Sequence, residues 1–210
     1  LGRWSAPHDV FYDQDAAHIP ELVRVLSDDD PRVRTLAIYA LGGLGPYDDP
    51  TATAILRSMS DPDHGVRSKA LSLASQLGPR SAESVPILIE EFQEHGSYTF
   101  ELEQLGPIAK EAVPALIDKL ANAEGYTKLG ICQALWKIER ESSLIVPRLI
   151  ELLDHDFGPI RRDAAELLGT IGPEAKAAVP RLQEMVDYVP RQDSSPMRDD
   201  SSLSKGLPLV

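Results

Sequence analysis

Residues 146–173 read VPRLIELLDHDFGPIRRDAAELLGTIGP, and this stretch carries the start and stop signals of two short helices. Pro147 suits the first position of a helix, where its missing N–H is not needed. Apolar residues then recur at intervals of three or four on both sides of a turn that contains Asp and Gly. Gly172 suits the left-handed position past a helix end, and Pro173 prevents continuation. The stretch therefore predicts a helical hairpin whose apolar faces need neighbours to cover them.

The Val-Pro pair that opens this hairpin recurs along the chain. It stands at Val85-Pro86, Val113-Pro114, Val146-Pro147 and Val179-Pro180, with a variant at Ile19-Pro20. The step is 33 residues from Pro114 to Pro147 and again to Pro180, and two such steps separate Pro20 from Pro86. A fixed period of this size is typical of a solenoid built from stacked units. We predict an all-α, right-handed α-solenoid of about five helical hairpins plus a partial sixth, over residues 19–189.

The third unit breaks the period, because Pro86 and Pro114 are only 28 residues apart. About one helical turn is missing between Gly96 and Leu105, so the second helix of this unit, roughly residues 98–105, should be short. We expect residues 1–18 to form an N-terminal arm that caps the first unit. The Ser- and Pro-rich residues 190–210 should form a flexible C-terminal tail.

One phrase resembles a known repeat. Asp30-Pro31-Arg32-Val33-Arg34, followed by Ala37, Ala40-Leu41 and Gly45-Pro46, is similar to a HEAT repeat, whereas the ankyrin and tetratricopeptide phrases are absent. The short period and the Gly-Pro-x-Ala-x-x-Ala-Val-Pro linker at residues 172–180 resemble the HEAT-like repeats of phycobilisome lyases and many bacterial scaffold proteins. The resemblance covers about residues 19–185 and implies an armadillo-like fold. It does not single out one function.

The charge of the chain limits its partners. The formal net charge is −12, which disfavours nucleic acid and anionic membrane surfaces and leaves a basic protein surface as the favoured partner. No apolar run is long enough to insert into a membrane. We expect a cytoplasmic protein, although the chain opens on Leu1, so an upstream segment and a removed export signal both stay open. The single Cys132 excludes an internal disulfide.

Catalytic, cofactor and metal motifs are absent from the sequence. His64, His95 and His155 fall near the turns of their units, but adjacent units lie about 10 Å apart, too far for these side chains to share an ion. Cys132 has no activating base nearby and aligns with apolar positions of other units, so it should pack in the core. We expect no enzyme activity, no cofactor and no metal.

Four basic residues occupy equivalent positions in their units: Arg34, Arg67, Lys128 and Arg161. They could form a ladder for an anionic ligand. The alternative, which the negative net charge favours, is that each bonds an Asp or a turn carbonyl inside the stack.

The predicted partner-binding surface lies on the second helices, which usually line the concave face of such a stack. Its residues are Tyr39, Leu71, Tyr98, Gln133 and Trp136. Exposed aromatic side chains would supply contact area for a partner. In the alternative, Trp136 and Phe100 fill the space left by the missing turn.

A second candidate surface is an acidic edge formed by the turns within the units. It comprises Asp28, Asp29, Asp61, Asp63, Asp154 and Asp156. These residues could dock a basic partner, or they could simply cap the second helices.

Together these patterns favour a non-catalytic protein–protein interaction scaffold, or a structural subunit of a larger assembly, that binds its partner in the concave groove. The resemblance leaves open a phycobilisome-lyase-like subunit that handles a bilin or another tetrapyrrole. Recognition of DNA lesions would need a basic concave face.

Overall fold

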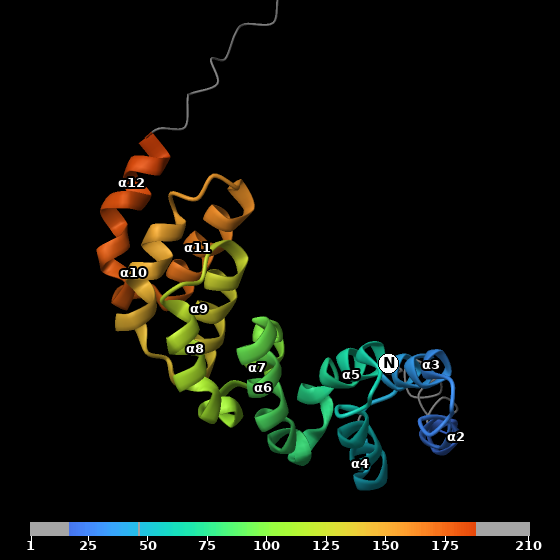
Figure 1. Ribbon diagram of the computed structural model, residues 1–210. Coiled ribbons are helices and arrows are strands. Elements are labelled where there is room, and N and C mark those ends of the chain that lie inside the picture. The colour runs from blue at the N-terminus through green and yellow to red at the C-terminus, as the bar shows by residue number, and fades with distance from the viewer. Residues whose placement is uncertain (1–16, 46, 188–210) are drawn as a thin grey trace, which may run out of the picture.

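The computed structural model describes residues 17–45 and 47–187. Within these ranges the regular elements are all helices, joined by turns and loops, and there are no strands (Figure 1). The helices follow one another in pairs, which we call units 1 to 5: α2 (Ile19–Val25) with α3 (Pro31–Leu41), α4 (Asp49–Ser58) with α5 (His64–Leu71), α6 (Val85–His95) with α7 (Thr99–Leu105), α8 (Val113–Leu120) with α9 (Gly125–Glu139), and α10 (Ser142–Leu152) with α11 (Gly158–Ile171). Helix α12 (Val179–Asp187) begins a further unit. The predicted all-α class is confirmed, and the right-handed sense stays a prediction. The predicted arm and tail lie almost wholly outside the described residues.

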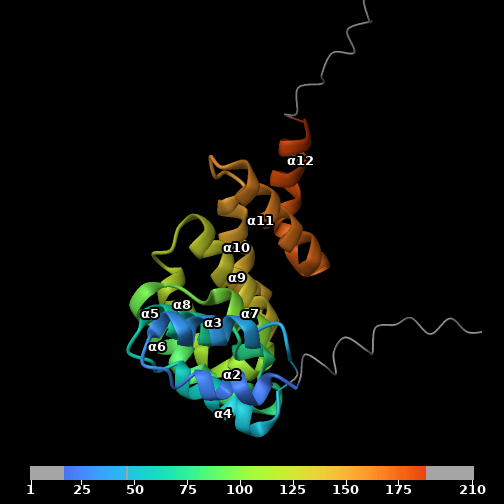
Figure 2. The same cartoon turned by 90° about the vertical axis from the view of Figure 1, so that its right-hand side faces the viewer.

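The helices form two layers along a bent row. Second helices pack on second helices, α3 on α5, α7 on α9 and α9 on α11, while α2 packs on α4 and α6 on α8. Figure 1 shows the row changing direction around α7 and α8, and Figure 2 gives the same stack from the side. The two ends of the described chain therefore lie at opposite ends of an elongated molecule.

A single apolar core runs the length of the stack. Its buried residues extend from Leu26 in unit 1 to Ala178 before α12. Equivalent positions of the second helices carry the buried residues Ala37, Ala70, Ile131 and Ala164. Each helix thus covers the apolar face of its neighbour, as the sequence period predicts.

The connections between units explain the recurring Gly-Pro pair. Gly78, Gly106 and Gly172 have positive φ angles of 58°, 54° and 73°, which glycine adopts without a Cβ penalty. A 3-10 segment follows each of them, η2 (Gly78–Ser84), η3 (Gly106–Ala112) and η4 (Gly172–Ala178), and leads into the Val-Pro start of the next helix.

The connection between units 4 and 5 departs from this pattern. Helix α10 begins at Ser142, so Pro147 lies inside the helix and its predicted place at the first helical position is wrong. Arg140, where the other units have proline, adopts a left-handed φ of 57°, and the Glu141 side chain accepts a hydrogen bond from the Ser143 N–H. This cap starts the helix early, and residues 142–146 extend α10 toward its N-terminus.

Unit 3 is short, as its spacing predicts. Helix α7 has seven residues and follows a tight connection in which Gly96 and Tyr98 both have positive φ. The helix lies very close to α9, because a Cβ atom added to Gly130 would stand only 2.6 Å from Thr99 Oγ1. Glycine at position 130 is what permits this approach.

The recurring basic residues bond inside the stack. Each arginine donates from Nη1 to two carbonyls of the turn before its own helix: Arg34 to Asp28 and Asp29, Arg67 to Asp61 and Pro62, and Arg161 to His155 and Asp156. Lys128 instead donates to the Glu151 carboxylate at 3.0 Å. These bonds favour the internal role over a ladder for anions.

Arg34 also links unit 1 to unit 2. Its Nη2 and Nε donate to the two carboxylate oxygens of Asp61 at 2.8 and 2.9 Å, and both side chains are largely shielded from water. The guanidinium holds the pKa of Asp61 below its ordinary value. The ionised pair therefore favours the folded stack.

We predict that Asp61→Asn lowers the melting temperature at pH 7 by a few degrees, because the amide cannot replace the bidentate ion pair. A carboxyl whose pKa falls on folding stabilises the protein above its ordinary value, about 3.9, and this contribution is lost as pH falls through the folded-state value. The difference between the two proteins should therefore shrink below about pH 4. Thermal melts over a pH series test this. Asp29→Asn, which removes the same charge from an exposed side chain, should melt like the wild type.

Candidate functional site

A groove between α3 and α5 holds Tyr39, the first of the predicted contact residues. It has a volume of about 560 Å³, and its lining includes Tyr39, Gly43, Lys69, Ser72 and Gln76. Tyr39 is 71% exposed, and the Lys69 ammonium lies 5.7 Å from its ring centroid. Leu36, one helical turn before Tyr39, is 68% exposed. Tyr39 and Leu36 thus form an apolar patch at the groove. Leu36 was missed by the sequence reasoning, although its spacing from Tyr39 places it on the same helical face.

Leu71 and Trp136 do not reach this surface, and the prediction that they face a partner is wrong. Leu71 is fully buried, and Trp136 is 6% exposed. Helix α9 packs against α7, α8, α10 and α11 as well as η3, so the side of α9 that was expected to be open is covered. The buried stripe on a second helix is therefore wider than the single line of apolar residues seen in the sequence.

The burial of Trp136 accompanies an exchange of side-chain sizes along α9. Aligned on the recurring basic residues, Trp136 takes the place of Gly42, Ser75 and Gly169, whereas Gly130 takes the place of Leu36, Lys69 and Asp163. Helix α9 thus has a glycine where it meets the short α7 and a large buried side chain six residues later. The Arg140 guanidinium lies 5.1 Å from the Trp136 ring centroid, and the buried Trp136 Nε1–H has no acceptor among the described residues.

The remaining predicted contact residues lie apart from the α3–α5 groove. Tyr98 is half-buried against the core beside α7, and Gln133 is partly exposed on α9. Phe100 is exposed, so it does not fill the space left by the missing turn. Of the five residues in the predicted surface, Tyr39 alone combines high exposure with a groove.

The acidic edge divides into structural and free carboxylates. Asp61 is paired with Arg34, and the Asp63 side chain accepts the Val66 N–H and caps α5. Asp28 accepts the Asp30 N–H, and Asp154 accepts from Arg181 Nε at 2.8 Å. The Asp29 and Asp156 side chains are exposed and have no ion-pair partner among the described residues. The cap interpretation therefore holds for Asp63, while Asp29 and Asp156 remain available to a partner.

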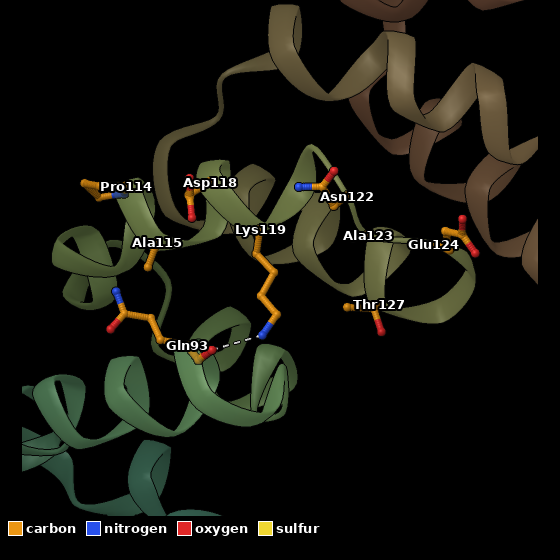
Figure 3. A pocket seen from close by; sticks show the side chains of 9 residues that line it. All are labelled: Gln93, Pro114, Ala115, Asp118, Lys119, Asn122, Ala123, Glu124 and Thr127. Atoms are coloured by element: carbon orange, nitrogen blue, oxygen red, sulfur yellow. Dashed lines mark hydrogen bonds between the residues drawn. The ribbon is translucent and has the colours of Figure 1, made fainter.

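A second hollow lies at this edge between units 3 and 4, and the sequence reasoning missed it. It has a volume of about 920 Å³, and its lining includes Gln93, Asp118, Lys119, Glu124 and Thr127 (Figure 3). Lys119 crosses from α8 to the end of α6, where its Nζ donates to the carbonyls of Phe92 and Gln93 at 3.2 and 3.1 Å. The lining has two carboxylates, Asp118 and Glu124, against the single ammonium group of Lys119, so its net charge is negative. The irregular spacing of unit 3 was the only signal in the sequence.

Cys132, the single cysteine of the chain, is buried in the core. Burial raises the pKa of the Cys132 thiol to about 12, so this cysteine is a packed core residue. Within residues 17–45 and 47–187, no three His, Cys, Asp or Glu side chains lie close enough together to hold a metal ion. In the same ranges no helix has the length and apolarity needed to cross a membrane.

We predict opposite effects for the two aromatic residues of the expected surface. Trp136→Ala should lower the free energy of unfolding by about 3–5 kcal/mol, because it empties a packed site. Tyr39→Ala should change it by no more than about 0.5 kcal/mol, as expected for an exposed side chain. Urea denaturation followed by far-UV circular dichroism measures both. Equal effects of the two substitutions would contradict the assigned burial.

Cys132 should be inert in the folded protein. We expect no reaction with Ellman's reagent at pH 8 in buffer and the release of one thiol equivalent after unfolding in urea, because the thiolate is the reactive form and the site is closed to solvent. Rapid labelling of the native protein would place this thiol at the surface and contradict the structure.

Comparison with known proteins identifies the repeat. No curated protein matches the chain. A family profile described as HEAT repeats matches residues 10–74 and 113–193, which together make up more than half of the sequence. The segment between the two matches contains unit 3, the one unit whose length departs from the period. The chain therefore belongs to the HEAT-repeat family.

Proposed function

We propose that this protein is a non-catalytic scaffold that binds a protein partner on the α3–α5 face of units 1 and 2. The observation that carries the proposal is the pair Leu36 and Tyr39, two large apolar side chains about 70% exposed on one face of α3, beside a groove. Exposed tyrosine next to a hollow is a common anchor in protein interfaces.

The groove is suited to recognition because its walls are fixed. The residues that directly follow α3 and α5 pack tightly, since a Cβ atom added to Gly42 would lie 3.2 Å from the Leu73 side chain. Arg34 and Asp61 tie the same two units together at the turn edge. A partner would therefore meet a preformed surface and lose less entropy than with a mobile one.

Charge supplies the second element of the proposal. The groove contains Lys69 and uncharged polar side chains, whereas Asp29, Asp156 and Glu124 present free carboxylates at the turn edge. A partner with a basic surface would be steered toward the molecule by its net charge of −12. We infer that the groove provides contact area and that the acidic edge provides orientation.

The bilin-handling alternative rests on the family resemblance alone. The buried Cys132 thiol does not offer a site for a thioether bond, and no observation in the structure favours a tetrapyrrole over a protein segment.

The test is affinity capture with quantitative mass spectrometry, using wild type, Leu36→Ser/Tyr39→Ser and the control Ile108→Ser. Ile108 is half exposed and lies in η3, outside the groove. We expect one set of partners to be retained by wild type and Ile108→Ser and to fall at least about tenfold with the double variant, which corresponds to the loss of a hot spot of about 1.4 kcal/mol or more.

Retention of the same partners by the double variant would exclude the groove as the binding surface. Absorption spectra of the protein expressed together with a bilin provide a separate check, since a bound chromophore would support the alternative.

A further inference from the structure

Two aromatic side chains stand in contact on the turn edge of units 4 and 5. The rings of Tyr126 and Phe157 have centroids 6.1 Å apart and planes at 72°, an edge-to-face arrangement. Tyr126 is nevertheless 56% exposed and Phe157 51% exposed. The pair therefore presents two ring surfaces to solvent, on a different part of the molecule from the Tyr39 groove.

Phe157 occupies a position where units 1 and 2 have a helix cap. It is the N-cap residue of α11, and the equivalent residues Asp30 and Asp63 accept a backbone N–H of α3 and α5. Phenylalanine cannot accept such a bond, and α11 has no side-chain cap. The Phe157 N–H donates to His155 Nδ1 at 3.0 Å, as the N–H groups of Asp30 and Asp63 donate to Asp28 and Asp61, so only the cap itself is lost. An exposed aromatic residue thus replaces a stabilising carboxylate, and such a break of a local rule is expected at functional positions.

The neighbouring unit breaks the same rule. Glu124 is the N-cap residue of α9, yet its side chain makes no capping bond. Glu124 precedes Tyr126 by two residues, and Asp156 directly precedes Phe157. Both carboxylates are exposed and lack an ion-pair partner among the residues described.

Of the three nearby basic side chains, Lys128 and Arg181 are paired with other carboxylates, whereas Arg161 is held by neutral carbonyls beside Asp156. Lys128 donates to Glu151, Arg161 to two turn carbonyls, and Arg181 to Asp154 and Glu184. The aromatic pair is therefore flanked by two carboxylates that form no ion pair among the described residues, and Arg161 offsets only part of their charge.

We propose that Tyr126, Phe157, Glu124 and Asp156 form a receptor for a lysine or arginine side chain from a basic segment of a partner protein. A cation is attracted to the face of an aromatic ring, and a carboxylate beside the ring strengthens the site. Glu124 also lines the hollow between units 3 and 4, together with Asp118, so the acidic surface continues past the rings and can accept further basic residues. The proposal rests on the proposed function only in treating the acidic edge as a partner-binding surface.

A purely structural role for the ring pair makes a different prediction about Phe157. If the rings serve only to hold units 4 and 5 together, replacing Phe157 should weaken the fold. If they serve a partner, Phe157→Asn should introduce the cap that α3 and α5 have and leave the fold equally or more stable, while binding is lost. Asparagine caps a helix about as well as aspartate and leaves the net charge unchanged.

The experiment measures fluorescence anisotropy of a short fluorescein-labelled Gly-Ser peptide with a Lys-Arg-Lys-Arg core, titrated with the full chain at low and physiological salt. The control peptide has Gln at each basic position. We expect binding of the basic peptide alone, weakened by salt, and at least about a fivefold loss of affinity in both Phe157→Asn and Tyr126→Ala. The melting temperature of Phe157→Asn should be equal to that of wild type or higher by about 2 °C.

Two matched variants separate this site from general attraction and from the Tyr39 groove. Phe100→Asn removes an exposed phenylalanine from α7, and Leu36→Ser/Tyr39→Ser removes the groove patch. Both should bind the basic peptide like wild type.

Equal affinity for the two peptides, or unchanged binding by Phe157→Asn, would overturn the proposal. So would a dimer, seen by analytical ultracentrifugation, that dissociates on Phe157→Asn, because the rings would then be an interface between copies of this chain. If Leu36→Ser/Tyr39→Ser retained the captured partners, the groove proposal would fail, but the peptide result would be unaffected. The two proposals can therefore fail separately.

Discussion

The structure depends on one constraint: no helical hairpin in this chain can cover its own apolar face. Each second helix buries residues such as Ala37, Ala70 and Ala164 against the next second helix, and the core is continuous only because the units follow one another at a regular distance. Arginines at equivalent positions reinforce this spacing by bonding the turn carbonyls of their own unit, and Arg34 extends the link to the following unit. The stacked helices position the α3–α5 groove, the acidic edge and the Tyr126–Phe157 pair.

Because the repeat is regular, an exposed residue can be compared with the residues at equivalent positions of other units. A carboxylate at a helix start is ordinary in this repeat, because Asp30 and Asp63 show what it does there. Phe157 at the same position is informative because it differs from Asp30 and Asp63 and cannot cap its helix. Tyr39 is informative for a different reason, since the residues of its own helix that contribute to the core, Ala37, Ile38 and Leu41, are fully covered while it is not.

The period of the Val-Pro pairs was sufficient to predict the helical class and the short α7, since these follow from local start and stop signals. The positions of Leu71 and Trp136 could not be predicted in the same way. Their burial depends on how closely neighbouring helices approach, and the approach of α7 to α9 is decided by Gly130 together with Thr99, two residues far apart in the sequence. The start of α10 was missed for a local reason, because Glu141 provides a cap ahead of the proline.

The shortened unit 3 has a consequence for the engineering of this chain. Repeats of a solenoid are commonly treated as interchangeable modules, but unit 3 and unit 4 are matched to each other. A unit of regular length in place of unit 3 would lengthen α7 beside a helix that has glycine where its counterparts have larger side chains and tryptophan where they have small ones. The short α7, Gly130 and Trp136 are thus structurally matched to one another. Any duplication or transplantation that keeps the fold must carry these two units together.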